Sequence, residues 1–339
     1  MALSLDDRQH ARRRFLEHSG YAEWSCSPFS SDASFRSYFR LQREGVAVLL
    51  MDAPPPQENA GRFKLVAKHL LDCGIRAPNV LASDLDAGFL IIEDFGDDTL
   101  TRLLDRGEDE EALYTMAVDA LTHLQRHENV RGIDVGDYDD ASLKRELGLF
   151  VDWFFPAATG KAMEEDAALS FYDAWESVWR SLPEARQTLV LRDYHVDNIM
   201  RVGPESTLDA CGLLDFQDAV IGPRCFDLMS LLEDARRDVS EETTRKMITR
   251  YKRAMSDSAD PEFDTWYSVM AVHRHMRILG VFVRLWRRDG KPAYLQHLPR
   301  VARLLLSHRD SGDLYPVFEW LDRHLPNLAQ GAASLSEGH

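Results

Sequence analysis

The chain has 339 residues, 45% of them hydrophobic, so it can bury a substantial core as one large domain or two lobes. Its 56 acidic residues outnumber its 40 lysines and arginines, and the net charge of −16 argues against broad binding to nucleic acid or anionic membranes. No apolar run in the sequence approaches the roughly 18 residues that a membrane-spanning helix needs. We therefore expect a cytoplasmic protein without nucleic-acid or membrane partners.

The first hundred residues have the pattern of short strands combined with helices. Residues 1–20 are typical of a short amphipathic helix. Apolar residues recur at helical spacing between 58 and 73, and Gly74 is a natural stop. Four short apolar segments are strand candidates, at residues 36–41, 46–51, 80–83 and 89–92. This order predicts a small sheet-based domain over residues 1–95.

From about residue 110 the pattern becomes helical. We predict helices around 113–124, over 143–155 with a stop at Pro156, over 170–181, and from 226 to about 325. Between Leu189 and Asp215 the chain briefly becomes strand-like. We expect a mainly helical domain over 96–326, followed by a disordered tail over 327–339 that is rich in Gly, Ala and Ser.

The strongest chemical signal lies in the strand-like stretch. Asp193 and Asn198 lie five residues apart in a polar loop between two apolar segments, and Asp215 follows a third apolar segment. Phosphoryl transfer needs a carboxylate that orients the acceptor hydroxyl and takes its proton, together with oxygen ligands that hold Mg²⁺ against the phosphates. Each residue alone is typical of a turn. The three in this order, with these flanking segments, indicate a phosphotransferase site.

These two loops resemble the catalytic and metal loops of the aminoglycoside phosphotransferase and choline kinase family, which is related to the protein kinases. The resemblance implies an α+β, protein-kinase-like two-lobed fold with a small antiparallel-sheet N-lobe and a mainly helical C-lobe. It also implies ATP as donor, Asp193 as catalytic base, and Asn198 and Asp215 as Mg²⁺ ligands. Leu191 replaces the usual His and Gln217 the usual Gly, and neither change removes a ligand.

The same resemblance assigns the nucleotide site to the N-lobe. The Ser-rich segment 30–40 would cover the phosphates, because small residues let backbone N–H groups approach them and Arg36 adds charge. The candidate residues there are Ser31, Ser34, Phe35 and Arg36. Adenine would meet the backbone of Glu93, Asp94 and Phe95.

One feature of the family is missing. A lysine is expected on the strand 46–51, and Met51 stands at about its position. Arg36, Arg40 and Lys64 are alternative cations that the sequence does not separate. The missing lysine also leaves open a pseudokinase that binds nucleotide or a partner without turnover.

Longer segments, including Asp215 to Val220, resemble the bacterial anomeric sugar kinases. These enzymes phosphorylate the C1 hydroxyl of N-acetylmuramate and N-acetylglucosamine in peptidoglycan recycling, and the resemblance runs from about residue 5 to 325. It implies an amino sugar as substrate, and we expect a monomer. The candidate sugar-binding residues are Glu146, Trp153, His195, Gln217 and Asp218. For Glu146 and Trp153, which share a helix face with Phe150, ordinary packing is the alternative.

The basic segment His273–Arg277, which continues to Arg284, Arg287 and Arg288, has two interpretations. It is either a solvated helix face or an attractor for the lactyl carboxylate of N-acetylmuramate. Other acceptors, such as an aminoglycoside, choline or homoserine, stay open for the same chemistry.

Overall fold

The computed structural model describes residues 5–29, 35–256 and 261–338. Its internal contacts divide the chain into two compact units. Unit 1 contains residues 1–133 and 196–219, and unit 2 contains residues 134–195 and 220–339. Asp193 thus belongs to unit 2, whereas Asn198 and Asp215 belong to unit 1. This division follows contacts alone, and the boundary expected after residue 95 stays a prediction.

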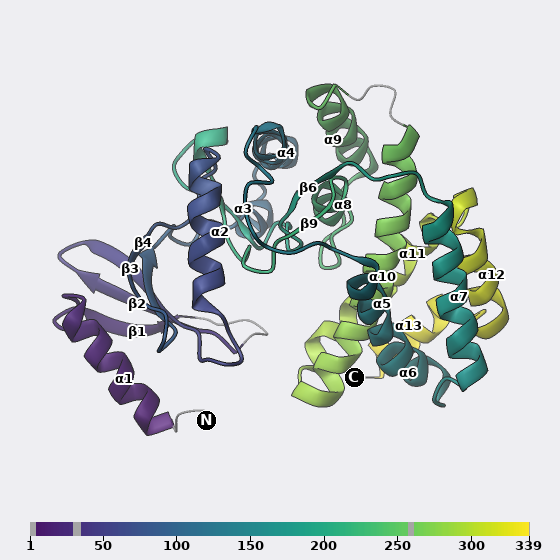
Figure 1. Cartoon of the computed structure of the whole chain (residues 1–339), viewed down its shortest axis with the longest axis horizontal. Helices are drawn as coiled ribbons and strands as arrows, with labels where there is room; N and C mark the ends of the chain where they lie inside the picture. The colour runs from purple at the N-terminus through teal and green to yellow at the C-terminus, as the bar shows by residue number, and fades with distance from the viewer. Residues whose placement is uncertain (1–4, 30–34, 257–260, 339) are drawn as a thin grey trace. The chain divides into compact units, whose positions relative to one another are not determined.

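Unit 1 contains a five-stranded antiparallel sheet in the order β1-β2-β3-β5-β4, preceded by helix α1 (Leu5–His18) (Figure 1). Its strands are β1 (Ser25–Phe29), β2 (Ser37–Arg43), β3 (Val46–Asp52), β4 (Val80–Asp84) and β5 (Phe89–Glu93). The four predicted strands are confirmed. Strand β1 was not predicted, because its exposed residues Ser, Cys, Ser and Pro lack apolar alternation.

A two-residue turn fixes the register of β2 and β3. Glu44 and Gly45 both have positive φ, at 53° and 81°, which matches the twist of a tight hairpin. Val48 then pairs with Leu41 on one buried face. Phe15 of α1 stacks on Phe89 of this face with ring centroids 5.6 Å apart. The amphipathic N-terminal helix predicted from sequence therefore covers the sheet.

The rest of unit 1 is helical apart from one small hairpin. Its helices are α2 (Ala60–Asp72), α3 (Leu100–Asp105) and α4 (Glu110–Arg126). Helix α2 begins after Asn59, whose side chain accepts a hydrogen bond from the N–H of Arg62 at 3.0 Å. Strands β7 (Ile199–Arg201) and β8 (Cys211–Leu213) form an antiparallel pair. The strand-like character predicted between 189 and 215 is confirmed for this pair.

Unit 2 consists mainly of helices packed around an apolar core (Figure 1). Strands β6 (Gln187–Val190) and β9 (Val220–Pro223) form its antiparallel pair. Its α-helices are α5 (Asp140–Leu149), α6 (Phe155–Thr159), α7 (Glu165–Ser181), α8 (Phe226–Leu232), α9 (Glu241–Ala254), α10 (Pro261–Asp289), α11 (Leu298–Ser307), α12 (Tyr315–His324) and α13 (Leu328–Glu337).

The helix predicted over 143–155 is interrupted by a π-helical turn, Phe150–Phe154, which follows α5 directly. Pro156 does not stop the chain as expected but lies in the first turn of α6, where its missing N–H costs nothing. Gly280 of α10 lies against this turn, since a Cβ there would be 2.1 Å from the carbonyl oxygen of Leu149. The change of helix type coincides with this close approach of two backbones.

The C-terminal segment differs from the predicted disordered tail. Residues 328–337 form helix α13, which packs on α11 and α6. Leu328 and Ala332 are buried, and they lie four residues apart on one helix face. Small residues allow this close packing, so the composition that suggested disorder instead suits a short covering helix.

A buried polar cluster links three helices of unit 2. Glu233, which follows α8, accepts hydrogen bonds from His275 of α10 at 2.7 Å and from His308, which follows α11, at 3.1 Å. Burial alone would raise the pKa of Glu233, but these histidine hydrogen bonds outweigh it and lower the pKa to about 2. The carboxylate is therefore charged in the folded protein over the whole ordinary pH range.

Replacing Glu233 with Gln is expected to lower the free energy of unfolding by about 1.5–3 kcal/mol at pH 7, because charge-assisted hydrogen bonds are lost. Urea unfolding followed by circular dichroism measures this difference. Since the folded pKa lies below the ordinary 4.5, the contribution is present above pH 4.5 and is lost as pH falls toward 2. A wild-type advantage that grew on acidification would contradict this account.

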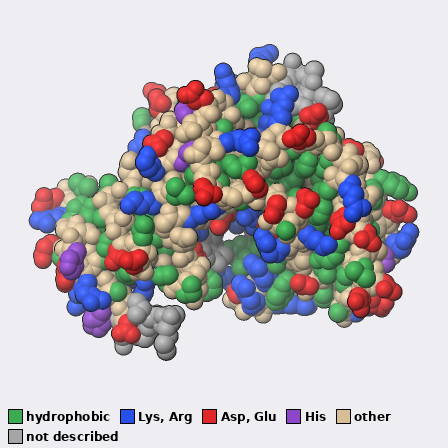
Figure 2. All heavy atoms as spheres, viewed as in Figure 1, with side chains coloured by type: hydrophobic (Ala, Val, Ile, Leu, Met, Phe, Trp, Pro, Cys, Tyr) green, Lys and Arg blue, Asp and Glu red, His purple; other side chains and the backbone are tan. Residues whose placement is uncertain are grey.

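Acidic and basic side chains are interspersed on the face shown in Figure 2. Exposed large apolar side chains, among them Leu65 of α2 and Leu169 of α7, are spread over different elements. Within the described ranges, none of the helices is both long enough and apolar enough to cross a membrane.

Candidate active site

Asn198 and Asp215 flank neighbouring ends of the β7–β8 hairpin in unit 1. Asn198 directly precedes β7, and Asp215 follows β8 by two residues. The N–H of Leu214 donates to the carbonyl oxygen of Asn198 at 2.9 Å, which fixes the two segments in register. The hairpin therefore brings the two predicted metal ligands to one end of a single hydrogen-bonded pair.

Asp215 has a strained backbone and an ordered side chain. Its φ of 56° lies in the left-handed region, which residues other than glycine rarely occupy and which often marks functional positions. Its Oδ1 accepts hydrogen bonds from Arg36 Nη2 at 2.7 Å and from Gln217 Nε2 at 3.0 Å. The side chain is 37% exposed, so it is held in place yet reachable.

Arg36 is the buried cation next to Asp215. Its Nε lies 3.5 Å from Oε2 of Glu58, which precedes α2 and also accepts a hydrogen bond from the N–H of Phe35 at 3.2 Å. Burial alone would lower the pKa of Arg36, but Tyr38 and Asp215 outweigh it and raise the pKa. Arg36 therefore stays charged although it is only 9% exposed.

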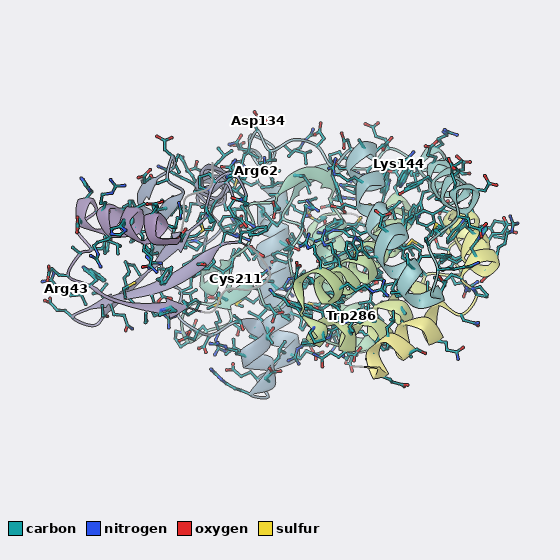
Figure 3. The ribbon with its side chains drawn as sticks, turned by 90° about the horizontal axis from the view of Figure 1, so that it is seen from below. Arg43, Arg62, Asp134, Lys144, Cys211 and Trp286 are labelled. Atoms are coloured by element: carbon teal, nitrogen blue, oxygen red, sulfur yellow. The ribbon has the colours of Figure 1, made fainter. Side chains whose placement is uncertain are left out.

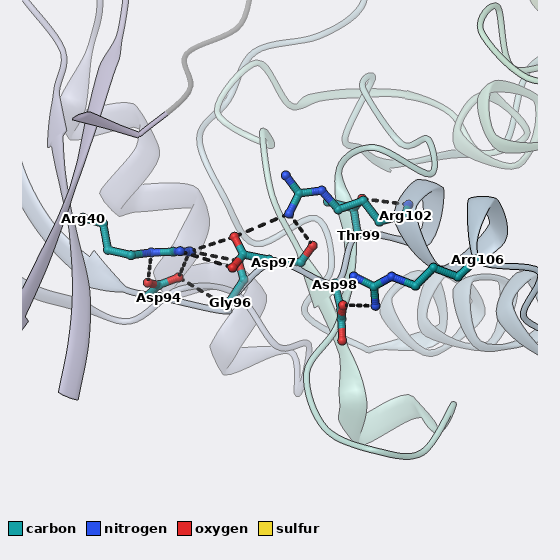
Figure 4. A network of polar contacts seen from close by, with 8 residues as sticks. All are labelled: Arg40, Asp94, Gly96, Asp97, Asp98, Thr99, Arg102 and Arg106. Carbon is teal, nitrogen blue, oxygen red and sulfur yellow. Dashed lines mark hydrogen bonds and ion pairs between the residues drawn. The ribbon is translucent and has the colours of Figure 1, made fainter. Parts of the chain in front are cut away.

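The other two cations considered for the missing lysine have different partners. Arg40 binds Asp94 through Nε at 2.7 Å and Asp97 through Nη2 at 3.1 Å, in the network of Figure 4. Lys64 is exposed and donates to the hydroxyl of Ser83 at 3.0 Å. Met51 itself is buried in β3. Of the three candidates, Arg36 is the one that contacts a predicted metal ligand.

The three residues predicted to meet adenine are held by neighbours within unit 1. Glu93 accepts from Nδ2 of Asn79 at 2.8 Å, and its own N–H donates to the carbonyl oxygen of Asn79 at 2.9 Å. Asp94 is bound by Arg40 (Figure 4). Phe95 packs on Gly212, where a Cβ would be 2.7 Å from the ring. The backbone donor of Glu93 is therefore already used.

The predicted phosphate-covering segment, residues 30–40, is described from residue 35 onward. Ser31 and Ser34 belong to the part that the structure does not describe. Phe35 is described and 68% exposed, and its N–H is bound by Glu58. Arg36, in the described part of this segment, is held by contacts with Glu58 and Asp215.

In unit 2, Asp193 lies in the loop that follows β6. The N–H of Asp193 donates to the carbonyl oxygen of Leu191 at 2.9 Å, and Arg192 between them has a φ of 71°. Asp227 of α8 accepts hydrogen bonds from the N–H groups of Leu191 at 2.7 Å and Arg192 at 2.9 Å. Burial raises the pKa of Asp227 to about 7, although both backbone donors favour its charged form. Asp227 fixes the backbone that carries the predicted base.

Glu146, predicted to bind sugar, is one of the anchors of the same loop. It accepts hydrogen bonds from the side chains of Tyr138 and Arg192, and Arg277 Nε lies 3.5 Å away. Burial alone would raise the pKa of Glu146, but Arg277 and Arg192 outweigh it and lower the pKa. The carboxylate is therefore charged and contacts the residue that precedes Asp193.

The other four predicted sugar-binding residues differ in the exposure of their side chains and in their neighbours. Trp153 lies in the π-helical turn and packs against the core of unit 2, while Phe150 is fully buried. His195 is 6% exposed, with Nε2 3.4 Å from Nη1 of Arg236. In unit 1, Gln217 is buried and donates to Asp215 and to the exposed Asp218. The structure therefore groups Gln217 and Asp218 with the metal-loop residue Asp215.

Two residues of this site were missed by sequence reasoning. Glu58 stands just before α2, and its only signal was a charged residue after a proline run. Arg62 on α2 (labelled in Figure 3) donates to the carbonyl oxygens of Gln217 at 2.9 Å and Ala219 at 2.5 Å. Both partners of Arg62 are more than 150 residues away in sequence, so no local pattern could reveal this clamp on the segment after Asp215.

The chemistry of the donor set fits the predicted metal ion. Asn198 offers an amide oxygen and Asp215 a carboxylate, which are the hard oxygen donors that Mg²⁺ prefers. Mg²⁺ commonly keeps water and phosphate oxygens as its remaining ligands, so one or two protein ligands suffice. Within the described residues there is no group of three or more His, Cys, Asp or Glu side chains that could hold a metal ion on its own.

Comparison with other sequences gives relatives over most of the chain. The profile of the phosphotransferase enzyme family matches residues 25–267. An N-acetylmuramate/N-acetylglucosamine kinase of Pseudomonas aeruginosa is 37% identical over 311 residues, which cover 90% of this chain and 89% of that protein. A kinase of the same name from Caulobacter vibrioides is 34% identical, with coverage of 96% and 99%.

Solved structures resemble the fold at low sequence identity. A choline/ethanolamine kinase family protein from Mesorhizobium loti has a TM-score of 0.61 at 13% identity, covering 95% of this chain and 99% of that one. An ADP-bound aminoglycoside phosphotransferase has a TM-score of 0.56 at 14% identity, with coverage of 89% and 97%. The predicted α+β, protein-kinase-like fold is therefore confirmed. The chain belongs to the phosphotransferase enzyme family.

Proposed function

We propose that this phosphotransferase is an ATP-dependent sugar kinase that phosphorylates the anomeric C1 hydroxyl of N-acetylmuramate and N-acetylglucosamine. The observation that carries the proposal is the kinship with kinases of that name, at 33–37% identity over at least four-fifths of this chain. Peptidoglycan recycling would supply both sugars. Because ATP is a cytoplasmic donor, we place the reaction in the cytoplasm. We also propose that the protein is a monomer.

In this reaction Asp193 would accept the proton of the C1 hydroxyl. Proton transfer to a positioned carboxylate makes the hydroxyl oxygen a better nucleophile toward the γ-phosphorus. Positioning is supported by Asp227, which binds the N–H groups of the two preceding residues, and by Glu146, which binds Arg192. Glu146 acts in this proposal through the loop and not by direct contact with the sugar. Trp153 and His195 remain candidates for the sugar pocket.

Asn198 and Asp215 would hold Mg²⁺. When bound, this ion would neutralise part of the negative charge of the phosphates. Gln217 orients Asp215 through its 3.0 Å hydrogen bond, and Asp218 lies beside it. The proposed adenine contacts are the backbone groups of Asp94 and Phe95, since the N–H of Glu93 is already used. Ser31 and Ser34 remain proposed phosphate-loop residues.

We also propose that Arg36 takes over the role of the missing strand lysine. It bridges Glu58 and Asp215, so it joins the segment before α2 to the metal loop. If Arg36 fills this role, the missing lysine no longer argues for a pseudokinase.

Replacing Arg36 with Met is expected to lower kcat/KM for ATP roughly 100-fold, because the buried charge that binds Asp215, and that would meet the phosphates in this proposal, is lost. Arg36→Lys should recover part of this loss. Initial-rate kinetics with varied ATP measure the effect. The matched control is Lys64→Met, which should stay within about twofold of the wild type. Equal losses for Arg36→Met and Lys64→Met would contradict the assignment.

The proposed function is tested by Mg²⁺-dependent release of ADP. We expect release to rise strongly when N-acetylmuramate or N-acetylglucosamine is added, and not when an aminoglycoside is added. Release with the aminoglycoside alone would keep the chemistry and overturn the acceptor. ATP binding without ADP release in the presence of any of these acceptors would favour the pseudokinase.

A further inference from the structure

The first part of the basic segment of α10, His273–Arg277, is not a solvated helix face, whereas Arg287 and Arg288 farther along are exposed. His273 and His275 are fully buried, and Arg274 is 4% exposed. His273 Nε2 lies 3.0 Å from the carbonyl oxygen of Leu143, and His275 binds Glu233. Burial is the largest cause that lowers the pKa of both histidines, so they are neutral near pH 7. The positive charge of this segment therefore comes from Arg274 and Arg277.

Arg274 is a buried cation with weak compensation. Its Nη1 donates to the carbonyl oxygen of Glu233 at 3.4 Å, and its Nε has no hydrogen-bond partner within the part of the chain that the structure describes. A buried guanidinium usually has a carboxylate or phosphate partner, because desolvation of the charge is costly. Burial lowers the pKa of Arg274, and Asp234 only partly opposes this shift.

The charges around Arg274 come from several elements of unit 2. The carboxylates are Asp193, Asp227 and Asp234, and the cations are Arg236 and Arg277. Asp234 is engaged with the N–H of Arg236 at 2.8 Å. Arg277 lies three residues from Arg274 on the same helix, so both project from similar faces, and its Nε is 3.5 Å from Glu146.

We propose that Arg274, assisted by Arg277 and Arg236, forms a subsite for the carboxylate of the acceptor sugar and thereby sets its preference for N-acetylmuramate. This inference rests on the proposed function. N-acetylmuramate differs from N-acetylglucosamine by a lactyl ether on the sugar ring, which adds one carboxylate. The same unit supplies Asp193, the proposed base that would contact the acceptor hydroxyl, and the Asp193 carboxylate is one of the charges near Arg274. A ligand carboxylate would give the Arg274 guanidinium a direct hydrogen-bonded charged partner, in place of the backbone carbonyl oxygen that it binds among the described residues.

A phosphoryl oxygen of ATP is also an anionic hydrogen-bond acceptor, so ATP is the other possible ligand of Arg274. The two sources predict different kinetics. A carboxylate subsite acts on N-acetylmuramate and spares N-acetylglucosamine, which lacks the charge. A phosphate subsite acts on both sugars equally and changes KM for ATP.

The test compares kcat/KM for three acceptors at saturating ATP and Mg²⁺: N-acetylmuramate, its neutral lactyl methyl ester, and N-acetylglucosamine. With the wild-type chain we expect kcat/KM for the acid to exceed that for the ester by about 10- to 100-fold. In Arg274→Gln, kcat/KM for the acid should fall about 10- to 100-fold more than for N-acetylglucosamine. Arg287→Gln, an exposed arginine of the same helix, is the matched control and should keep the wild-type ratio.

The outcomes separate this inference from the proposed function. Equal turnover of acid and ester by the wild type would overturn the subsite while leaving the kinase intact, and this comparison holds even if Arg274→Gln does not fold. Equal losses for both sugars with a raised KM for ATP would assign Arg274 to phosphate. If neither sugar is phosphorylated, the proposed function fails and the subsite fails with it.

Discussion

Replacing Asp193 with Asn is expected to lower kcat about 10²- to 10⁴-fold with either sugar, because the amide cannot accept the hydroxyl proton. Asn has nearly the shape of Asp, so the loop held by Asp227 should keep its conformation. Steady-state kinetics measure the loss, and titration calorimetry should show ATP binding close to that of the wild type.

The matched control is Asp209→Asn, which makes the same change at an exposed position in the turn between β7 and β8. It should keep wild-type kcat. Turnover by Asp193→Asn within a few-fold of the wild type would remove Asp193 from the role of base. A parallel loss in Asp209→Asn would show that the assay reports general damage.

Replacing Asp227 with Ala is expected to lower the free energy of unfolding by roughly 2–6 kcal/mol, because two buried N–H groups lose their acceptor. The carboxylate binds Leu191 and Arg192 at 2.7 and 2.9 Å and is fully buried. Since these bonds fix the loop that carries Asp193, kcat should also fall. Urea unfolding at pH 7, followed by circular dichroism, measures the stability change.

Asp227→Asn separates the two effects of that substitution. Its amide keeps one carbonyl acceptor, so the stability loss should be smaller than that of Asp227→Ala, and part of kcat should survive. Equal unfolding free energies for Asp227→Ala and the wild type would show that the two hydrogen bonds do not hold the loop.

Local patterns in the sequence predicted much of the sheet and the order of the chemical groups. Strands β2 to β5 alternate or run apolar between clear turns, and α2 has apolar residues at helical spacing. Asp193, Asn198 and Asp215 stand beside short apolar strands, and such spacing can be seen without a structure.

Tertiary contacts decided what the sequence did not show. Arg36 and Asp215 are 179 residues apart, so the sequence could not show that they form an ion pair. Arg36 was therefore one of three candidate cations for the missing lysine. The surroundings of Glu146 depend on Arg192 and Arg277, which come from a loop and a distant helix. The π-helical turn at Phe150–Phe154 coincides with the close approach of Gly280, and the sequence near residue 150 does not predict that contact.

Phosphorus NMR of the protein with ATP, Mg²⁺ and N-acetylmuramate would test the proposed anomeric phosphorylation. We expect a new signal of a sugar 1-phosphate, coupled to the anomeric proton, that grows as ATP is converted to ADP. The same signal should form with N-acetylglucosamine and be absent with Asp193→Asn. A phosphate attached at another hydroxyl, or unchanged ATP with both sugars, would contradict the account.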